Sequence, residues 1–328
     1  MIIDKKKEEE FFSKDFNFSY SSLNRLLFSP SLFYKDYILK EKEIRLDKHL
    51  IEGSVIHCLL FEADKLKEKF KIVPGKAPSD SVRKVLYSMQ NYTDAVKLDD
   101  VEDFVILDAL KEVNLYQSLK KDDQRLAKIR TSDNADYWQF MMNDIKNIID
   151  LDTLNKCKER VELLNENEEV KTALTQKQSD FELDPITTYA EAYLKCDLAS
   201  YDFGLHGYID FYEINDDTKE VTIYDLKTTS KSITDFKDTV EYYNYWLQAA
   251  IYSKLVFENL PEEKKEYTIR FRFIVIDSYD QVYIFNVSIE SMSSWMDDLF
   301  NALEAAKYHF DTKNFNLPYE FLVRRVNL

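Results

Sequence analysis

GYIDFYEI (residues 207–214) and EVTIYDLKTT (residues 220–229) are neighbouring stretches in which apolar and polar side chains alternate. A period of two is typical of β-strands, because successive side chains point to opposite faces of a sheet. The intervening NDDTK, residues 215–219, has the polar composition of a turn. Together the three stretches are predicted to form a β-hairpin.

Three charged side chains fall at one end of this hairpin. On the second strand, Asp225 and Lys227 follow Val221 and Ile223 on the same face, so an apolar face ends in an acid and a base. The turn brings Asp210 of the first strand beside Asp225. Because a buried charge is costly unless it is paired or binds metal, two interpretations remain. One is a metal-dependent catalytic site, and the other is a structural salt bridge between Lys227 and an aspartate.

Phosphodiester hydrolysis needs the side chains that meet here. Carboxylate oxygens hold divalent metal ions, which lower the pKa of a bound water and neutralise charge that develops on the phosphate. A lysine can orient that water or stabilise the transition state. The hairpin therefore favours a nuclease, with the salt bridge as the structural alternative.

Two helical segments add polar pairs at a spacing of four residues. In HLIEGSVIHCLLFE (residues 49–62), Gly53 precedes His57, and histidine is a frequent metal ligand. In YNYWLQAAIYSKL (residues 243–255), Gln248 and Tyr252 share a helix face. The alternatives are a structural histidine in the first helix and an ordinary amphipathic stripe, with Tyr245, in the second.

Composition limits the classes of partner and cofactor. The net charge of −16 by itself argues against nucleic acid, although a nuclease needs only a basic groove, to which its metal ions add positive charge. The three widely spaced cysteines exclude a zinc ribbon and an iron–sulfur cluster with four Cys ligands. No apolar stretch approaches the roughly 20 residues of a membrane helix, and the Lys- and Glu-rich start is unlike a signal peptide. We therefore expect a cytoplasmic protein with no membrane partner.

The order of GSVIHCLLFE, GYID, IYDLKTT and QAAIY resembles the PD-(D/E)XK nuclease superfamily. The closest likeness is to the RecB-like branch, which includes phage-type exodeoxyribonuclease VIII (RecE-like) proteins. That branch has a helical G-x-x-x-H motif, a G-x-x-D strand, a D-x-K strand and a Q-x-x-x-Y helix. SYSSLNRLLFSPSLFY, residues 19–34, is similar to its opening. The resemblance covers roughly residues 18–62 and 185–290.

The resemblance implies a role for each matching residue. His57, Asp210 and Asp225 would ligate Mg²⁺ or Mn²⁺, and the backbone carbonyl of Leu226 would complete the site. Lys227 would position or activate the attacking water. The chain lacks the cysteines of the relatives that carry an iron–sulfur cluster, which favours the phage-exonuclease side of the branch.

Further residues are candidates for outer roles. Gln248 and Tyr252 would contact DNA near the scissile phosphate or support Lys227, and Glu191 matches an acidic position that would serve as an outer metal ligand. Arg270 and Arg272 alternate onto one face of a later strand, where they would touch phosphate or simply face solvent.

The activity implied is a 5′→3′ exonuclease acting on double-stranded DNA ends in recombination or DNA processing, in a bacterial or phage-infected cell. It would leave 3′ single strands for a single-strand annealing protein, and a ring-shaped homo-oligomer would suit it. The alternatives are an endonuclease or flap-type nuclease of the same superfamily, an RNA nuclease, and an inactive DNA-binding or assembly module.

The expected fold is mixed α/β: a restriction-endonuclease-like core with a central mixed sheet flanked by helices, plus a large helical insertion. Further helices are expected at 48–62, 238–258 and 290–310, a strand at 188–198, and a second hairpin at 267–289. The chain is predicted to divide into a charged, partly disordered arm (1–18), N-terminal core helices with the G-x-x-x-H motif (19–70), a mainly helical insertion (71–180) and the catalytic core (181–328).

Overall fold

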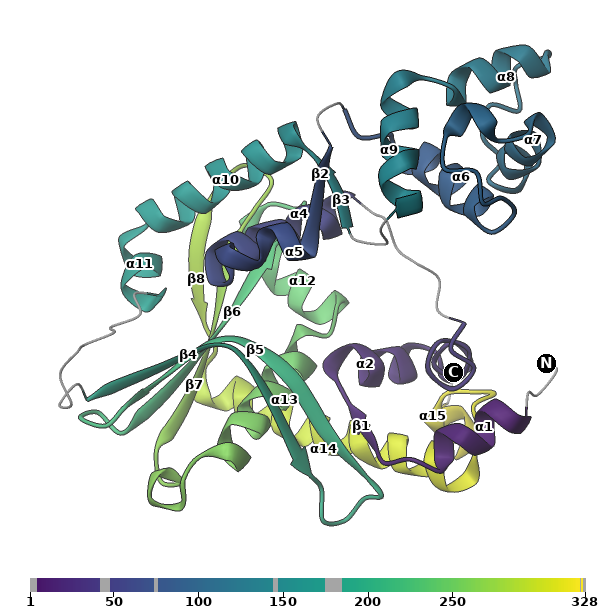
Figure 1. Cartoon of the computed structure of the whole chain (residues 1–328). Helices are drawn as coiled ribbons and strands as arrows, with labels where there is room; N and C mark the ends of the chain where they lie inside the picture. The colour runs from purple at the N-terminus through teal and green to yellow at the C-terminus, as the bar shows by residue number, and fades with distance from the viewer. Residues whose placement is uncertain are drawn as a thin grey trace. The chain divides into compact units, whose positions relative to one another are not determined.

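The computed structural model describes residues 5–41, 48–73, 76–143, 147–174, 185–324 and 326 (Figure 1). The chain separates into two compact units. The first comprises Met1–Ile44 with Asn167–Leu328, and the second comprises Arg45–Glu166. The predicted boundary between insertion and catalytic core, at residues 180 and 181, lies outside the described residues.

A mixed six-stranded sheet is the centre of the first unit. Its strands run in the order β1-β5-β6-β7-β8, and β4 also pairs with β5. The β4–β5, β5–β6 and β7–β8 pairs are antiparallel, whereas β1–β5 and β6–β7 are parallel. The mixed sheet flanked by helices confirms the predicted fold class. The strands are β1 (Phe16–Phe18), β4 (Ile186–Asp197), β5 (Phe203–Asn215), β6 (Glu220–Thr228), β7 (Thr268–Ile276) and β8 (Val282–Asn286).

The crossover between the parallel strands β6 and β7 contains two helices, α12 (Phe236–Tyr242) and α13 (Tyr245–Asn259). The prediction of one continuous helix over 238–258 is therefore wrong. The break falls at Asn244, whose φ of 56° and ψ of 42° lie in the left-handed region. A residue in that conformation cannot continue a right-handed helix.

Apolar side chains from the sheet and the helices form one core in this unit. Most of α13 is buried, and it packs against α14 (Ile289–Thr312), β4, β5 and β7 (Figure 1). The segment expected to be an arm contains α1 (Lys5–Phe12), whose Phe11 and Phe12 pack on this core. The remaining helices of the unit are α2 (Tyr20–Phe28), α3 (Pro30–Phe33), the π-helix η1 (Tyr34–Ile38), α11 (Glu168–Leu174), the 3₁₀ turns η4 (Ile233–Asp235) and η5 (Glu262–Lys264), and α15 (Tyr319–Leu322).

The second unit is mainly helical and has its own core. Fully buried Trp138 and Leu86 are among the apolar side chains of that core, which extends from Val73 to Ile148. A two-stranded parallel sheet, β2 (Phe70–Val73) with β3 (Asn147–Asp150), was not expected from the helical pattern. The helices are α4 (Lys48–Phe61), η2 (Ala63–Lys65), α5 (Leu66–Lys69), α6 (Asp80–Gln90), η3 (Leu98–Asp100), α7 (Asp103–Glu112), α8 (Asp122–Ile129), α9 (Ser132–Asn143) and α10 (Leu151–Glu166).

Among the described residues, no helix combines the length and the apolar character that crossing a membrane would require.

Candidate active site

Asp210 and Asp225 lie where the ladder between β5 and β6 ends. Phe211 and Tyr224 are the last paired residues, and the two aspartates come next on their strands. The Oδ2 of Asp210 accepts a hydrogen bond of 2.8 Å from the backbone N–H of Leu226. A side chain thus holds the two strands together at this point. Both carboxylates are buried, with Asp225 only 1% exposed.

Lys227 forms an ion pair with Asp225. Its Nζ also donates a 2.9 Å hydrogen bond to Oε1 of Gln248 and lies 4.6 Å from the ring centroid of Tyr245. Burial disfavours the charged amine, but the attraction of Asp225, with smaller effects of Tyr245 and Asp210, outweighs it, so the pKa of Lys227 is raised. The ammonium form is held in place by three different groups.

Gln248, in α13, completes this arrangement. Its Nε2 donates a 2.9 Å hydrogen bond to Oδ1 of Asp225, while its Oε1 accepts from Lys227. Asp225, Lys227 and Gln248 therefore form a closed triangle of polar contacts. One amide satisfies both members of a buried ion pair, which reduces the cost of burying them.

Tyr252 lies one helical turn beyond Gln248 and is also buried. Burial, followed by the negative charges of Asp225 and Asp210, raises the pKa of its hydroxyl well above the ordinary value. A Cβ added at Gly207 of β5 would lie 2.9 Å from the Tyr252 ring. The glycine of the GYID segment therefore allows α13 to approach the strand that carries Asp210.

Glu191 interrupts the regular pairing of β4 with β5. Ala190 pairs with Phe211 and Ala192 with Ile209, whereas Glu191 has a φ of 49°. Position 191 stands opposite Asp210 in this register. A residue with left-handed backbone conformation inside a strand changes the direction of the side chains around it. Such distortions occur often next to active sites.

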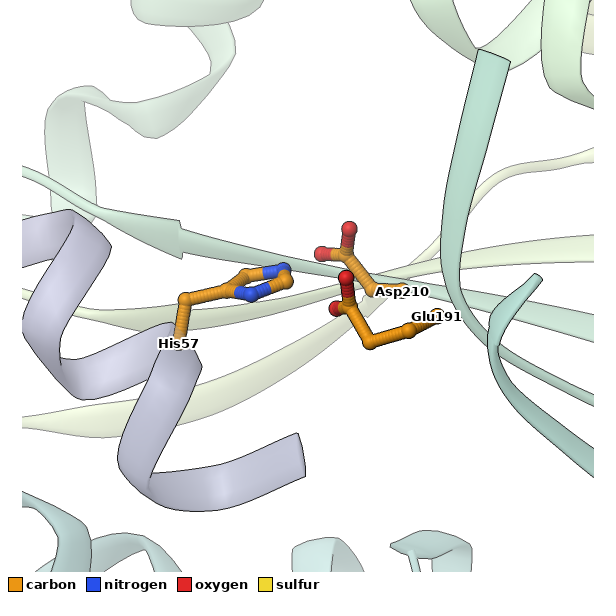
Figure 2. A group of neighbouring side chains, drawn as sticks. All are labelled: His57, Glu191 and Asp210. Carbon is orange, nitrogen blue, oxygen red and sulfur yellow. The ribbon is translucent and has the colours of Figure 1, made fainter. Parts of the chain in front are cut away.

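Figure 2 shows Glu191 and Asp210, two carboxylates of the first unit that could hold a metal ion. Glu191 and Asp210 each offer one carboxylate oxygen, and these atoms lie within 4.8 Å of each other. His57 belongs to the second unit, and its part as a ligand stays a prediction. Carboxylate oxygens and an imidazole nitrogen are a donor set that suits Mg²⁺ or Mn²⁺. Asp225, predicted to be a metal ligand, is in contact with Lys227 and Gln248, and its part as a ligand stays a prediction. Leu226 contributes its backbone N–H to Asp210, and the part of its carbonyl stays a prediction.

Arg270 and Arg272 are not brought to the carboxylates. They pair in register with Thr222 and Tyr224, the residues that alternate with Asp225 along β6 and face the other side of the sheet. Arg270 is bonded to Glu220 at 2.8 Å, and the Arg272 guanidinium lies 5.8 Å from the Tyr224 ring centroid. A contact of these arginines with phosphate stays a prediction.

Tyr245 is the neighbour of the site that sequence reasoning assigned only to an amphipathic stripe. It lies three residues before Gln248, on the same helix, and covers Lys227. The spacing of three residues could have indicated this role. Positions three apart on a helix are neighbours, so the Tyr245 ring can reach the same group, Lys227, that Gln248 contacts.

The chain was compared with known families, curated proteins and solved structures. The family model of the PD-(D/E)XK nuclease superfamily matches residues 17–307. No curated protein matches. A crystal structure from Eubacterium rectale, of a protein provisionally named an exonuclease, is similar with a TM-score of 0.52 and 12% identity, over 100% of this chain and 94% of the other. At that identity the likeness shows the fold. The family match spans nearly all of the chain, including every predicted site residue, and the chain therefore belongs to the PD-(D/E)XK nuclease superfamily.

Proposed function

We propose that the protein is a metal-dependent deoxyribonuclease whose catalytic residues are Asp210, Asp225 and Lys227. The observation that carries the proposal is the buried contact between Lys227, Asp225 and Gln248 at the strand end where Asp210 also lies. A purely structural ion pair does not require a second carboxylate beside it. Here two acids and one base converge within a chain that belongs to a nuclease superfamily.

Asp210 and Glu191 are the residues of the first unit that would hold Mg²⁺ or Mn²⁺. His57 is the third ligand that the resemblance implies. Asp225 and the carbonyl of Leu226 are the further donors that the resemblance implies. A bound divalent ion would lower the pKa of a water ligand and offset negative charge on the phosphate. The carboxylate and imidazole donors fit such an ion, whereas soft metals prefer thiolates.

The protein's own side chains would divide the remaining work. Lys227 would face the phosphate oxygens or the attacking water, and Asp225 and Gln248 would fix the direction of its ammonium group. Tyr252 would support this end of α13 against β5. Such preorganised charge is effective because the site is largely shielded from water.

The preferred substrate is a double-stranded DNA end, digested 5′→3′ in recombination in the cytoplasm, with a single-strand annealing protein as partner. Two likenesses support this choice: the RecE-like order of motifs, and the solved structure that carries an exonuclease name. A homo-oligomeric ring would add processivity. Endonuclease action, RNA cleavage and an inactive binding module are the competing outcomes of the experiment below.

The test uses the purified full chain with linear and closed circular DNA, each with Mg²⁺, Mn²⁺ or EDTA. We expect metal-dependent loss of linear DNA alone, and a decrease of roughly 100-fold or more in Lys227→Ala, in the range seen when one transition-state donor is removed. Lys254→Ala is a matched control, since Lys254 is a partly buried lysine of α13 that pairs with Glu258 of the same helix. End-labelled strands give the polarity.

Three results would contradict parts of the proposal. Cleavage of circles would retain the site and make the protein an endonuclease. Selective loss of RNA would change the substrate class. Full activity in Lys227→Ala, or no cleavage by a folded wild-type protein under any of these conditions, would reject the catalytic assignment.

A further inference from the structure

The break between α12 and α13 is held by hydrogen bonds to α2 and to Trp246 of α13. The carbonyl of Tyr243 accepts hydrogen bonds from the Tyr20 hydroxyl at 2.5 Å and from Nδ2 of Asn24 at 3.2 Å. Asn244 donates from its own Nδ2 to Oδ1 of Asn24 at 2.7 Å and accepts from the Trp246 indole at 3.0 Å. Four hydrogen bonds therefore fix a residue in the left-handed region, a conformation that persists only where its surroundings enforce it.

The break presents a series of tyrosines that begins at the catalytic lysine. The Tyr245 ring, which covers Lys227, is stacked with Tyr243 at a centroid distance of 5.6 Å and an angle of 26°. Tyr243 in turn meets Tyr242 edge to face at 4.8 Å and 90°. Two rings, those of Tyr245 and Tyr243, thus link the Lys227 ammonium group to Tyr242.

The outer two rings are largely open to solvent. Tyr242 is 73% exposed and Tyr243 is 45% exposed, and Lys231 lies with its Nζ 5.2 Å from the Tyr242 ring centroid. Neither ring belongs to the core of the unit, although Tyr245 packs on it. Adjacent exposed aromatic side chains on a rigid support are characteristic of a binding surface, because they contribute contact area with little loss of side-chain entropy.

We propose that Tyr242 and Tyr243 form a stacking platform for unpaired DNA bases next to the scissile phosphate, with Lys231 beside the backbone of the same strand. The inference rests on the proposed nuclease function and specifies its substrate: a strand whose terminal nucleotides are unpaired. Aromatic rings bind bases through their faces, and in a duplex those faces are covered by neighbouring base pairs. Bases freed at an end are therefore the ones that the platform accepts.

The charge of the chain supports this choice of ligand. With a net charge of −16, the protein gains little attraction for DNA from its overall field. Stacking supplies affinity that does not depend on net charge, and a single lysine at the platform needs to meet only one phosphate. A platform close to Lys227 would also align the strand for cleavage, since bases and phosphates are linked within each nucleotide.

The test measures single-strand binding to the full chain. A single-stranded oligonucleotide and a blunt duplex, each with 2-aminopurine near the terminus, are titrated with Ca²⁺ in place of Mg²⁺. We expect stacking to quench the fluorescence of the single strand, and Tyr242→Ala with Tyr243→Ala to weaken its binding at least tenfold, as loss of base stacking does. Tyr242→Phe and Tyr243→Phe keep the rings and are expected to stay within about twofold of wild type. Phe300→Ala is the control, because it removes from α14 a ring whose exposure (59%) lies between those of Tyr242 and Tyr243.

The outcomes separate this inference from the proposed function. If the double alanine variant cleaves DNA like wild type and shows unchanged quenching and binding, the platform is overturned and the nuclease assignment stands. The exposed tyrosines would then serve a different partner, such as a protein. Equal losses in the phenylalanine and alanine variants would overturn stacking as the cause. Stacking-dependent binding without any cleavage would support the platform and reject the nuclease.

Discussion

At the scale of single residues, the candidate site depends on how one amide serves a buried ion pair. Asp225 and Lys227 were predicted to share a face because they are two apart on a strand, and both contact Gln248. The alternation of side chains along a strand predicts that Asp225 and Lys227 share a face, because backbone geometry fixes its period at two residues. The positive φ of Glu191 was not predictable, because the strand pattern around it is regular and glutamate has no preference for that conformation.

Gln248→Leu tests the amide directly. The change keeps the volume but removes both 2.9 Å hydrogen bonds, so the buried charges of Lys227 and Asp225 lose a partner. We expect a loss of about 1–3 kcal/mol in the free energy of unfolding, measured in urea, and a decrease in kcat of roughly tenfold or more with little change in KM. Gln124→Leu, at an exposed position of α8, is the control. Unchanged kcat in a folded Gln248→Leu protein would show that Lys227 does not need the amide.

At the scale of elements, the hairpins and α14 follow their sequence patterns, but the helix between β6 and β7 does not. Val240, Leu247 and Ile251 keep helical spacing through the break, and no glycine or proline marks it. The break is stabilised by Asn24, which lies 220 residues earlier in the chain than Asn244. A tertiary contact of that kind overrides local periodicity. The local sequence carries only the weak signal of Asn244 itself, because asparagine adopts the left-handed region more readily than most residues.

Substitutions at Asn244 separate the two contributions that stabilise the break, which are the side-chain hydrogen bonds and the left-handed backbone conformation. Asn244→Ala removes the hydrogen bonds to Asn24 and Trp246 and keeps a Cβ in the left-handed region, so we expect a loss of about 1–3 kcal/mol in the free energy of unfolding. Asn244→Gly removes the same hydrogen bonds but adopts the conformation readily, and is expected to be less destabilised by about 1 kcal/mol. Urea unfolding of the two variants measures the difference. If glycine proved as damaging as alanine, backbone conformation would not contribute.

At the scale of the molecule, a continuous segment interrupts the unit that carries the sheet. The contact-defined unit Arg45–Glu166 begins earlier than the insertion expected at 71–180, because α4 packs against α10, which lies about a hundred residues later. Sequence similarity groups the G-x-x-x-H helix with the nuclease motifs, whereas packing groups it with the helical segment. Charge carries no mark of this boundary, since both units mix charged and apolar residues along the chain.

The two separate cores lead to a prediction about local stability. Leu86 is fully buried in the core of the second unit, and Leu247 is fully buried in that of the first. Leu86→Ala is expected to cost roughly 3 kcal/mol through lost contacts and a cavity. Because that core is built from residues 73–148, hydrogen exchange should accelerate in α6, α7 and α9 while the amides of β5, β6 and α13 keep their protection. Leu247→Ala should give the opposite pattern. Equal acceleration in both units by either variant would mean that the chain unfolds as one cooperative body, and that the insertion is energetically part of the nuclease core.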